Sequence, residues 1–448
     1  MAMATLTRRT VLNTAALATT ALLAPFVHGA YAAGKLSCGF WDHWVPGANE
    51  PLAKLCREWA EREKIDLTID FITSQGDKLA LTATAEAQAR SGHDVLQMSD
   101  WYVAAQADNL APVDELVRSL IDEHGKVLLG SEYIGKHKGH WIAVPTGVQT
   151  TGQNPCARID HFKQFVGVDV TRMYPAGEPP DEPLADAWTW DAFLVAAEKC
   201  AKAGYPFGMP LSTCSDAVNW VSAVFAGQGA QLVDVEGNIT VKSDEVKEVL
   251  AWFKQIVPFL PPSVFAWDNA SNNKWLISGQ GALIMNPPGA WAVAVRDAPK
   301  VAEQLWTFHS PKGPKGRFDP CSFGFWGIWS FSPNAAAAKS LLTHLSTRSS
   351  VERLVAGSHG VDIPPFEKLR DFKTWEEERP PAGTLYNYPP RKDVTALLAG
   401  YPAPTSLGAQ MFAQGTICKM VAQCTQQGKS IDQAIDWART ELEGFMRT

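Results

Sequence analysis

Strand-like and helix-like segments alternate between residues 35 and 123, and this alternation restricts the fold more than any other feature of the sequence. Short apolar or β-branched runs predict strands over 35–41, 65–72 and 94–98. Helical spacing of apolar and alanine residues predicts helices over 49–64, 77–90 and 114–123. A chain that alternates in this way favours an α/β fold with a largely parallel sheet.

The residues that follow these three strands combine aromatic rings with polar groups. In parallel α/β sheets, ligands bind outside the carboxyl ends of the strands. Those ends carry Trp-Asp-His-Trp at 41–44, Ser-Gln-Gly-Asp at 74–77 and Ser-Asp-Trp-Tyr at 99–102. A sugar site needs flat aromatic faces for C–H groups and polar side chains for hydroxyls. The candidate contacts from the first and third loops are Trp41, Asp42, His43, Trp44, Asp100 and Trp101.

The composition is that of an ordinary globular chain with an unusual number of tryptophans. Its 448 residues exceed the size of one typical domain, so we expect two or more lobes. Seventeen tryptophans suit a ligand surface, because an indole offers a large apolar face and one N–H. The net charge of −7 gives the chain no global electrostatic reason to bind nucleic acid or anionic lipid.

The first 32 residues have the pattern of an export leader. Residues 7–12 read Thr-Arg-Arg-Thr-Val-Leu, a twin-arginine pattern, and no acidic residue precedes Asp42. The apolar stretch 15–27 is too short to span a bilayer, and 30–32 has the small residues of a cleavage site. We therefore expect a twin-arginine signal peptide over 1–32 and a periplasmic mature chain that starts at Ala33.

The common catalytic and metal-binding motifs are absent from the sequence. It has no Walker A loop, no Gly-x-Ser-x-Gly, no His-Glu-x-x-His and no dinucleotide-binding Gly-x-Gly-x-x-Gly. The eight cysteines form no Cys-x-x-Cys pair, so a zinc site is not indicated. We expect no metal, no cofactor and no enzyme activity. A pair of glycosidase carboxylates stays open as an alternative, because such a pair leaves no local motif.

Strand and helix signals continue through the rest of the chain. Strands are expected over 141–145, 282–285 and 322–331. Thr189 and Ser243 are positioned as N-caps of amphipathic helices. We also expect a turn over 286–291, which reads Asn-Pro-Pro-Gly-Ala-Trp, and one helix over 408–427.

Four segments in this part of the chain have a characteristic order and spacing. They are 139–145 (Gly-His-Trp-Ile-Ala-Val-Pro), 188–191 (Trp-Thr-Trp-Asp), 277–291 (a Gly-x-Gly-Ala strand start followed by Gly-Ala-Trp) and 325–337 (Phe-Trp-Gly-Ile-Trp-Ser-Phe-Ser-Pro-Asn-Ala-Ala-Ala). Together they resemble the extracellular solute-binding proteins of ABC importers, in the sugar-binding group that includes maltose-binding protein. Residues 154–158, Asn-Pro-Cys-Ala-Arg, depart from the Tyr-Asn-Lys-Asp that many members carry.

The resemblance implies an α/β, two-lobed periplasmic-binding-protein fold with hinge-connected, discontinuous lobes. Its first lobe would comprise 33–147 and about 325–378, and its second lobe 148–324 and about 379–448. Such lobes close around a ligand by hinge motion.

The hinges would lie in two crossover segments, near 144–150 and 322–328. Gly147, Gly324 and Gly327 fall in these segments and can absorb backbone rotation.

Alignment with the family adds four candidate ligand contacts. Gln149 falls on the first crossover, at a position that often holds an acidic contact. Asp216, Asn219 and Trp220 fall on the loop of the second lobe that often stacks the sugar.

Three further tryptophans are candidates: Trp267, Trp291 and Trp326. Trp291 lies in the expected turn after a strand, where an indole can face a cleft. For Trp291, as for Trp41, packing in the core is the alternative.

The resemblance implies a periplasmic substrate-binding component of an ABC transporter. It would bind a sugar, a small oligosaccharide or a polyol in the cleft between the lobes and deliver it to the membrane permease. We expect a monomer without a nucleic-acid partner. A secreted carbohydrate-active enzyme and a binding protein for a non-sugar such as a polyamine stay open. A polyamine site needs several acids around tryptophan, whereas each predicted loop carries one.

Overall fold

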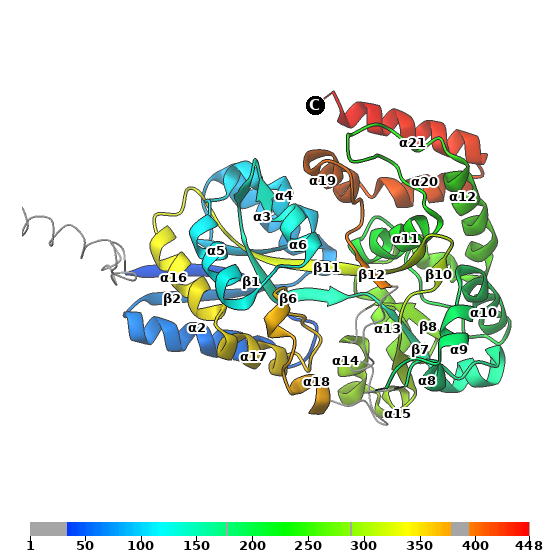
Figure 1. The fold of residues 1–448 in the computed structure, drawn as a ribbon, viewed down its shortest axis with the longest axis horizontal. Helices are drawn as coiled ribbons and strands as arrows, with labels where there is room; N and C mark the ends of the chain where they lie inside the picture. The colour runs from blue at the N-terminus through cyan, green and yellow to red at the C-terminus, as the bar shows by residue number, and fades with distance from the viewer. Residues whose placement is uncertain (1–33, 176–177, 287–288, 378–393, 448) are drawn as a thin grey trace, which may run out of the picture.

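Two lobes lie side by side along the long axis of the molecule (Figure 1). The computed structural model describes residues 34–175, 178–286, 289–377 and 394–447. The expected signal peptide, 1–32, lies outside the described residues, as does the lobe boundary expected near 378–379.

The first lobe is built on a sheet whose core is parallel. Strand β1 (Lys35–Trp41) pairs in parallel with β2 (Asp66–Ile72) and with β3 (Val95–Ser99). β3 is buried along its whole length, and Cys38 and Phe40 of β1 are fully buried. The predicted α/β lobe with a largely parallel sheet is confirmed.

Helices cover both faces of this sheet, as continuous burial of parallel strands requires. In α2, the predicted apolar stripe Leu52, Leu55, Cys56 and Trp59 is buried. The helices of this lobe are α2 (Asn49–Glu63), α3 (Lys78–Ala89), α4 (Trp101–Ala105), α5 (Asp114–His124), α6 (Leu129–Ile134), α16 (Ala335–Leu345), α17 (Arg348–Gly357) and α18 (Thr374–Glu377). A small hairpin joins β4 (Lys136–His137) to β5 (His140–Trp141).

Two long strands cross from one lobe to the other (Figure 1). β6 (Val144–Gly152) and β11 (Gly316–Ile328) pair antiparallel, with a register shift between Ser322 and Gly324. One end of β11 pairs with β3. Its other end pairs with β10 (Lys312–Gly313) and β12 (Val394–Leu397) in the second lobe. Both strands are longer than predicted, because each finds a pairing partner beyond the expected segment.

The second lobe contains a small antiparallel sheet in a shell of helices. β7 (Pro155–Arg158) lies between β8 (Leu283–Met285) and β9 (Leu305–Thr307). The helices are α7 (Ile159–His161), α8 (Val170–Met173), α9 (Glu182–Ala187), α10 (Trp190–Lys202), α11 (Ser215–Gln228), α12 (Asp244–Ile256), α13 (Ser271–Ile277), α14 (Gly289–Asp297), α15 (Pro299–Ala302), α19 (Thr405–Ala413), α20 (Thr416–Thr425) and α21 (Ile431–Phe445).

Helix starts in this lobe agree with the sequence, but two other expectations were wrong. The Thr189 and Ser243 side chains cap α10 and α12, as predicted. The expected single helix over 408–427 is divided by Gly415, whose φ of 57° ends the helical path. The expected turn up to residue 291 is shorter, since α14 already begins at Gly289.

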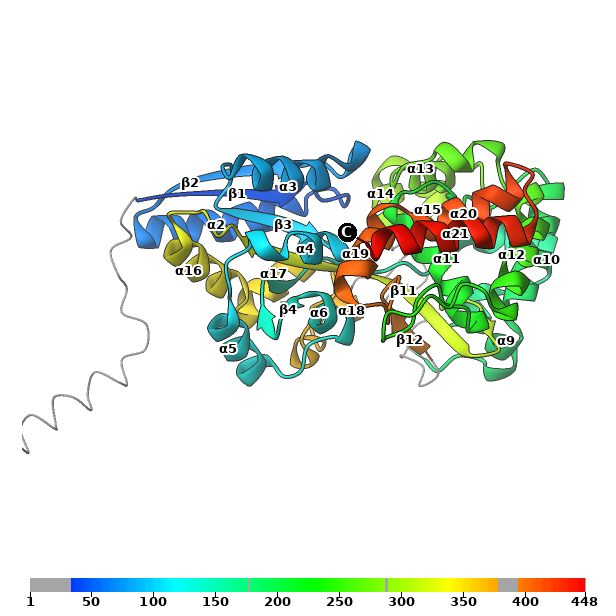
Figure 2. The ribbon, with the colours of Figure 1, turned by 90° about the horizontal axis from the view of Figure 1, so that it is seen from above.

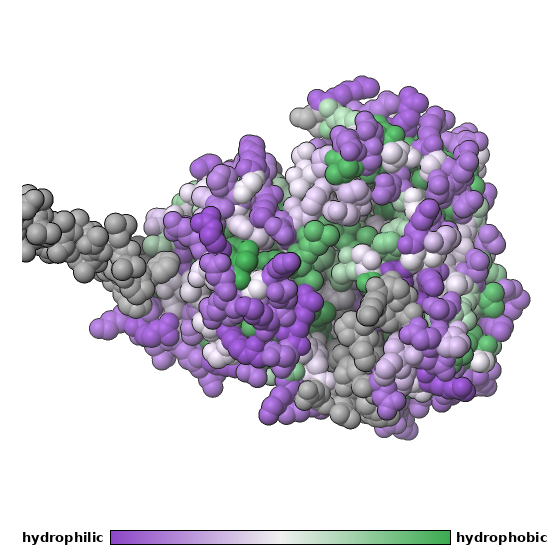
Figure 3. Space-filling view, in the orientation of Figure 1, coloured by the Kyte–Doolittle hydropathy of each residue, from purple (hydrophilic) through white to green (hydrophobic). Residues whose placement is uncertain are grey.

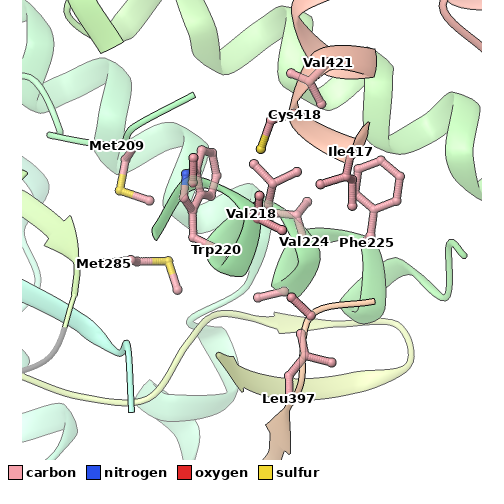
Figure 4. Close-up of a cluster of buried hydrophobic side chains, with 14 of the residues drawn as sticks. Met209, Val218, Trp220, Val224, Phe225, Met285, Leu397, Ile417, Cys418 and Val421 are labelled. Atoms are coloured by element: carbon pink, nitrogen blue, oxygen red, sulfur yellow. The ribbon is translucent and has the colours of Figure 1, made fainter. Parts of the chain in front are cut away.

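The core of the second lobe is rich in large apolar side chains. Figure 4 shows Trp220 of α11 in a buried cluster with Met209 and Met285. On the face drawn in Figure 3, hydrophobic residues gather in the middle, where the lobes meet, and hydrophilic residues cover the periphery.

No helix in the described part of the chain is both long and apolar enough to cross a bilayer. All eight cysteines are free thiols, and burial raises the pKa of Cys156 to about 12.

Candidate ligand-binding cleft

A polar cavity of about 260 Å³ lies between the two lobes. The first lobe contributes the loops after β1, β2 and β3, and the second lobe contributes the start of α11, the α13 region and the end of β8. The crossing strands β6 and β11 also line it. The lining residues are Trp41, Asp42, His43, Trp44, Val45, Thr73, Ser74, Gln75, Ser99, Asp100, Gln149, Thr151, Gln153, Ser215, Asp216, Asn269, Ala270, Asn273, Asn286, Gly289, Ser322 and Val361.

Seven of the candidate contacts line this cavity. They are Trp41, Asp42, His43, Trp44, Asp100, Gln149 and Asp216. The carboxyl ends of parallel strands meet at one edge of the sheet, which is why loops distant in the sequence converge here. Their contact with a ligand stays a prediction.

The loop after β1 is held in place by hydrogen bonds around His43. The Nδ1 atom accepts from the backbone N of Val45 at 2.9 Å, so Nε2 carries the hydrogen that faces Asp362 Oδ2 at 3.1 Å. The backbone N of His43 donates to Asn49 Oδ1, and Asn49 Nδ2 donates to Asp42 Oδ1. This network fixes the direction in which the neighbouring indoles point.

Trp41 and Trp44 supply the aromatic wall of the cavity. The Trp41 ring packs on the His43 ring with centroids 4.4 Å apart, and its Nε1 donates to Ser74 Oγ. The Trp44 Nε1 is buried and has no hydrogen-bond partner among the described residues. A Cβ placed on Gly289 would lie 3.0 Å from Trp44 Cδ1, so this indole of the first lobe reaches the start of α14 in the second.

Asp100 is a buried carboxyl on the first-lobe wall. Its Oδ2 accepts from Ser322 Oγ at 2.7 Å and its Oδ1 from the backbone N of Phe323 at 2.9 Å. Burial raises its pKa to about 7, although these hydrogen bonds act in the opposite direction. Its φ of 50° is unusual for a residue other than glycine.

Asp216 is a buried carboxyl on the second-lobe wall. Its Oδ1 accepts from Gln153 Nε2 at 3.0 Å, and its Oδ2 accepts from the side-chain amides of Asn272 and Asn286. Burial raises its pKa to about 7, and the charge of Asp100 adds to that effect. Among the described residues, its side-chain hydrogen-bond donors are all amides, and none of them carries a positive charge.

Trp101, Asn219 and Trp220 lie outside the cavity, which corrects their assignment as ligand contacts. Trp101 is 1% exposed, and its indole N–H donates to the carbonyl of Ala399 in the second lobe. Trp220 is fully buried and donates to the carbonyl of Pro210, and Asn219 is buried beside it in α11. These side chains point away from the strand ends because helical rotation turns them into the core.

Trp291, Trp326 and Trp267 are also placed away from the cavity. Trp291 packs in an apolar cluster with Ile284 and Leu305, because α14 turns it inward. Trp326 belongs to the first-lobe core, edge-on to Phe40. Trp267 packs against Trp275 at 5.4 Å and donates to Ser263 Oγ.

Several polar residues of the second wall were not predicted. Gln153, Ser215, Asn269, Asn273 and Asn286 line the cavity. Asn286 directly follows β8, but β8 belongs to an antiparallel sheet, to which the rule for parallel strand ends does not apply. Gln153 likewise directly follows the crossing strand β6, whereas Ser215, Asn269 and Asn273 follow no strand end.

A second cavity of about 240 Å³ lies within the second lobe, between α11, β12, α19 and α20. Its lining is mainly apolar, with Phe225, Leu397, Met411 and Ile417 among its residues. Such a lining gives a sugar few hydrogen-bond partners.

No three His, Cys, Asp or Glu side chains of the described residues are grouped to hold a metal ion.

Comparison with known proteins matches this architecture to one family. The family model for bacterial extracellular solute-binding proteins matches residues 56–380. A "Probable ABC transporter-binding protein" of Deinococcus radiodurans is 24% identical over 279 residues. That alignment covers 58% of this chain, and the chain spans 63% of the relative's length.

Solved structures share the fold at low sequence identity. The maltose-bound MalE3 of T. maritima is 19% identical with a TM-score of 0.71, over 91% of this chain and 99% of that one. A solute-binding protein of Thermotoga lettingae TMO, bound with α-D-tagatose, is 15% identical with a TM-score of 0.72, over 92% and 99%. A sugar transporter protein of Arthrobacter chlorophenolicus A6 with bound laminaribiose is 14% identical with a TM-score of 0.70, over 92% and 99%. At this identity the likeness shows the two-lobed α/β fold.

Proposed function

Since the chain belongs to the family of bacterial extracellular solute-binding proteins, we propose that it captures a sugar, a small oligosaccharide or a polyol in the cavity between its lobes. The observation that carries this proposal is the composition of the cavity wall. Trp41 and Trp44 offer aromatic faces, while carboxyl and amide groups from both lobes surround them. This combination suits a ring with apolar faces and a polar rim.

The protein would deliver its ligand to the membrane permease of an ABC importer. The similarity to the Deinococcus ABC transporter-binding protein and to the sugar-bound structural neighbours supports this role. We also propose that the chain is exported by the twin-arginine pathway, is cleaved before Ala33 and works in the periplasm as a monomer. The first lobe would comprise 33–147 and about 325–378, and the second 148–324 and about 379–448.

Calorimetry of the purified protein against a library of sugars and polyols tests the binding proposal. We expect a dissociation constant near the micromolar range, which corresponds to about −8 kcal/mol. The sugar should be recovered unchanged by chromatography after prolonged incubation. Cleavage of an oligosaccharide would instead support the alternative of a carbohydrate-active enzyme.

We further propose that the lobes close on the ligand by bending of the crossing strands near 144–150 and 322–328. Small-angle scattering should give a smaller radius of gyration for the saturated protein than for the free protein. An unchanged radius at saturation contradicts lobe closure without affecting the binding proposal.

A further inference from the structure

The cavity wall carries several acidic groups and no basic side chain capable of balancing them. Asp42, Asp100 and Asp216 line the cavity, and Asp77 lines an adjoining pocket that shares Ser99 and Gln149 with it. Neither lining contains a lysine or an arginine among the described residues. The sequence suggested one acid per loop and therefore a neutral ligand, but the fold brings these acids together around two indoles.

Three other buried acidic side chains, Glu86, Asp319 and Asp362, each have a histidine neighbour, whereas Asp94 is held by hydroxyl, backbone and amide donors. The carboxylate of Asp319 receives a hydrogen bond from His309, and Glu86 is paired with His93 in the same way. His43, the histidine at the cavity, is already engaged by Asp362. Asp100 and Asp216 have only hydroxyl, backbone and amide donors among the described residues, although a buried charge without a counter-charge is costly. A positive group on the ligand would supply the counter-charge that these two carboxylates lack among the described residues.

Two buried amide oxygens at the cavity also lack a hydrogen-bond donor. Gln153 and Asn273 are each 5% exposed, and both line the cavity. The Gln153 Nε2 donates to Asp216, so the other end of the amide must be an acceptor. Within the described part of the chain, neither this Oε1 nor the Oδ1 of Asn273 has a hydrogen-bond partner. Acceptors without donors match an ammonium group, which has three N–H donors and no acceptor.

The same wall presents features that a bare polyamine would leave unused. Trp44 Nε1 is a buried donor without an acceptor, which a sugar hydroxyl or ring oxygen can provide. The indoles of Trp41 and Trp44, which a polyamine chain would contact with little of its surface, also line the cavity. A ligand that satisfies all these groups carries both hydroxyls and a basic nitrogen.

We propose, building on the carbohydrate-binding function above, that the ligand is an aminated carbohydrate or polyol whose ammonium group is held by Asp100 and Asp216. The carboxylates fix the nitrogen, Gln153 and Asn273 accept its remaining hydrogens or those of neighbouring hydroxyls, and the indoles cover the faces of the ring.

Binding should be linked to proton release. Asp100 and Asp216 have pKa values raised to about 7, so both are largely protonated at pH 6. The titratable groups that interact with one or other of them are Asp268, Tyr102, Cys214 and Cys321, and Asp42 and His43 line the same cavity. Burial raises the pKa of Tyr102 and of both thiols, so these three stay neutral between pH 6 and 8. An ammonium ligand must therefore displace protons from the carboxyls at pH 6.

Calorimetry with matched sugars tests the proposal on the unmodified sequence. The probes are glucosamine, N-acetylglucosamine and glucose, the same three forms of galactose, and the β-1,4-linked disaccharides of glucosamine, N-acetylglucosamine and glucose. Within at least one set, the amine should bind about tenfold or more tightly than both neutral forms at pH 8. At pH 6, its binding enthalpy should depend on the ionisation enthalpy of the buffer.

The variants Asp100→Asn and Asp216→Asn should each remove most of the preference for the amine. Asp122→Asn, at an exposed position near the end of α5, removes one negative charge from the first lobe and should leave the preference unchanged. Circular dichroism melts establish that each variant is folded, and the comparison of matched sugars on the wild type does not depend on them.

The outcomes separate this inference from the proposed function. Neutral sugars that bind as tightly as their amines, or more tightly, overturn the aminated ligand and leave the carbohydrate-binding function in place. Binding of putrescine or spermidine with no sugar binding overturns both. Failure of every amine in the panel to bind also overturns the inference.

Discussion

The Nε2 atom of His43 lies 3.1 Å from Asp362 Oδ2, and both side chains are 3% exposed. The Oδ1 of the same carboxylate accepts a hydrogen bond from the backbone N of Gln149 at 3.1 Å. Gln149 lies on the crossing strand β6 and has a φ of 72°. Asp362 therefore joins the loop that carries Trp41 and Trp44 to the strand on which the lobes would turn.

Replacing Asp362 with alanine should weaken both folding and ligand binding. Removal of the carboxylate leaves the His43 and Gln149 donors buried without an acceptor, which typically costs about 1–3 kcal/mol each. Urea unfolding and calorimetry measure the two effects. Asp362→Asn keeps one acceptor oxygen and should retain more of the free energy of unfolding and more of the ligand affinity. Equal losses in the two variants would contradict the role of the Asp362 carboxylate as an acceptor.

The variants Trp44→Ala and Trp291→Ala should have opposite effects. Trp291 is 5% exposed in an apolar cluster, so its removal should lower the free energy of unfolding by about 3–5 kcal/mol. Trp44 lines the cavity, so its removal should cost about 2 kcal/mol or more of binding with a smaller effect on the free protein. Urea unfolding without ligand and calorimetry with ligand distinguish these effects. A Trp291→Ala protein with normal stability and lost affinity would restore Trp291 to the site.

Two glycines of the crossing segments should respond differently to alanine. A Cβ on Gly324 would lie 2.0 Å from the carbonyl oxygen of Val148, a backbone atom that cannot move alone. Gly324→Ala should therefore destabilise the protein by about 1–3 kcal/mol. A Cβ on Gly147 would meet its nearest neighbour at 3.5 Å, so Gly147→Ala should be neutral or slightly stabilising. Thermal unfolding of the two variants measures the contrast, and equal melting temperatures would be evidence against the tight pairing of β6 with β11.

The buried acids of the cavity should make the free protein less stable as the pH rises. The pKa of Asp100 and Asp216 is about 7 in the folded protein and ordinarily 3.8, so the folded state holds more protons between pH 4 and 7. The free energy of unfolding then falls as the pH rises through this window. Each carboxyl contributes a decrease of about 1.4 kcal/mol per pH unit.

The variants Asp100→Asn and Asp216→Asn lack this contribution. Their free energy of unfolding relative to the wild type should increase from pH 5 to pH 8, as urea unfolding at each pH would show. The comparison removes contributions from groups that both proteins share. A difference that stays constant or decreases with pH would mean that the two carboxyls are already ionised at pH 5.

The first-lobe wall of the cavity was predictable from the sequence, because its residues follow strands. Trp41 is the last residue of β1, Asp42, His43 and Trp44 follow it, and Asp100 comes directly after β3. Local hydrophobic patterns identified the strands, and parallel pairing brings their ends together. Position relative to a strand end therefore identified these five residues, although the same rule also selected Trp101, which is buried outside the cavity.

The second wall depended on contacts that no local pattern encodes. Trp220 and Trp291 share the residue type expected of a sugar site, yet helix orientation buries both in the core. Asp362 follows no strand end, and its role arises only because the fold places it beside His43. The acidic character of the cavity was missed for the same reason, since its acids come from segments distant in the sequence.

The pairing of β3 with β11 has a consequence for how the chain is made. Ile328 is aligned with Val95, more than 200 residues earlier in the chain. Until the ribosome has released β11, β3 has an unpaired edge and the first lobe has an incomplete sheet. Such distant contacts slow folding and expose aggregation-prone edges. The nascent chain should therefore need a holding chaperone through most of its synthesis, and a transcript truncated before residue 316 should yield aggregates rather than a folded first lobe.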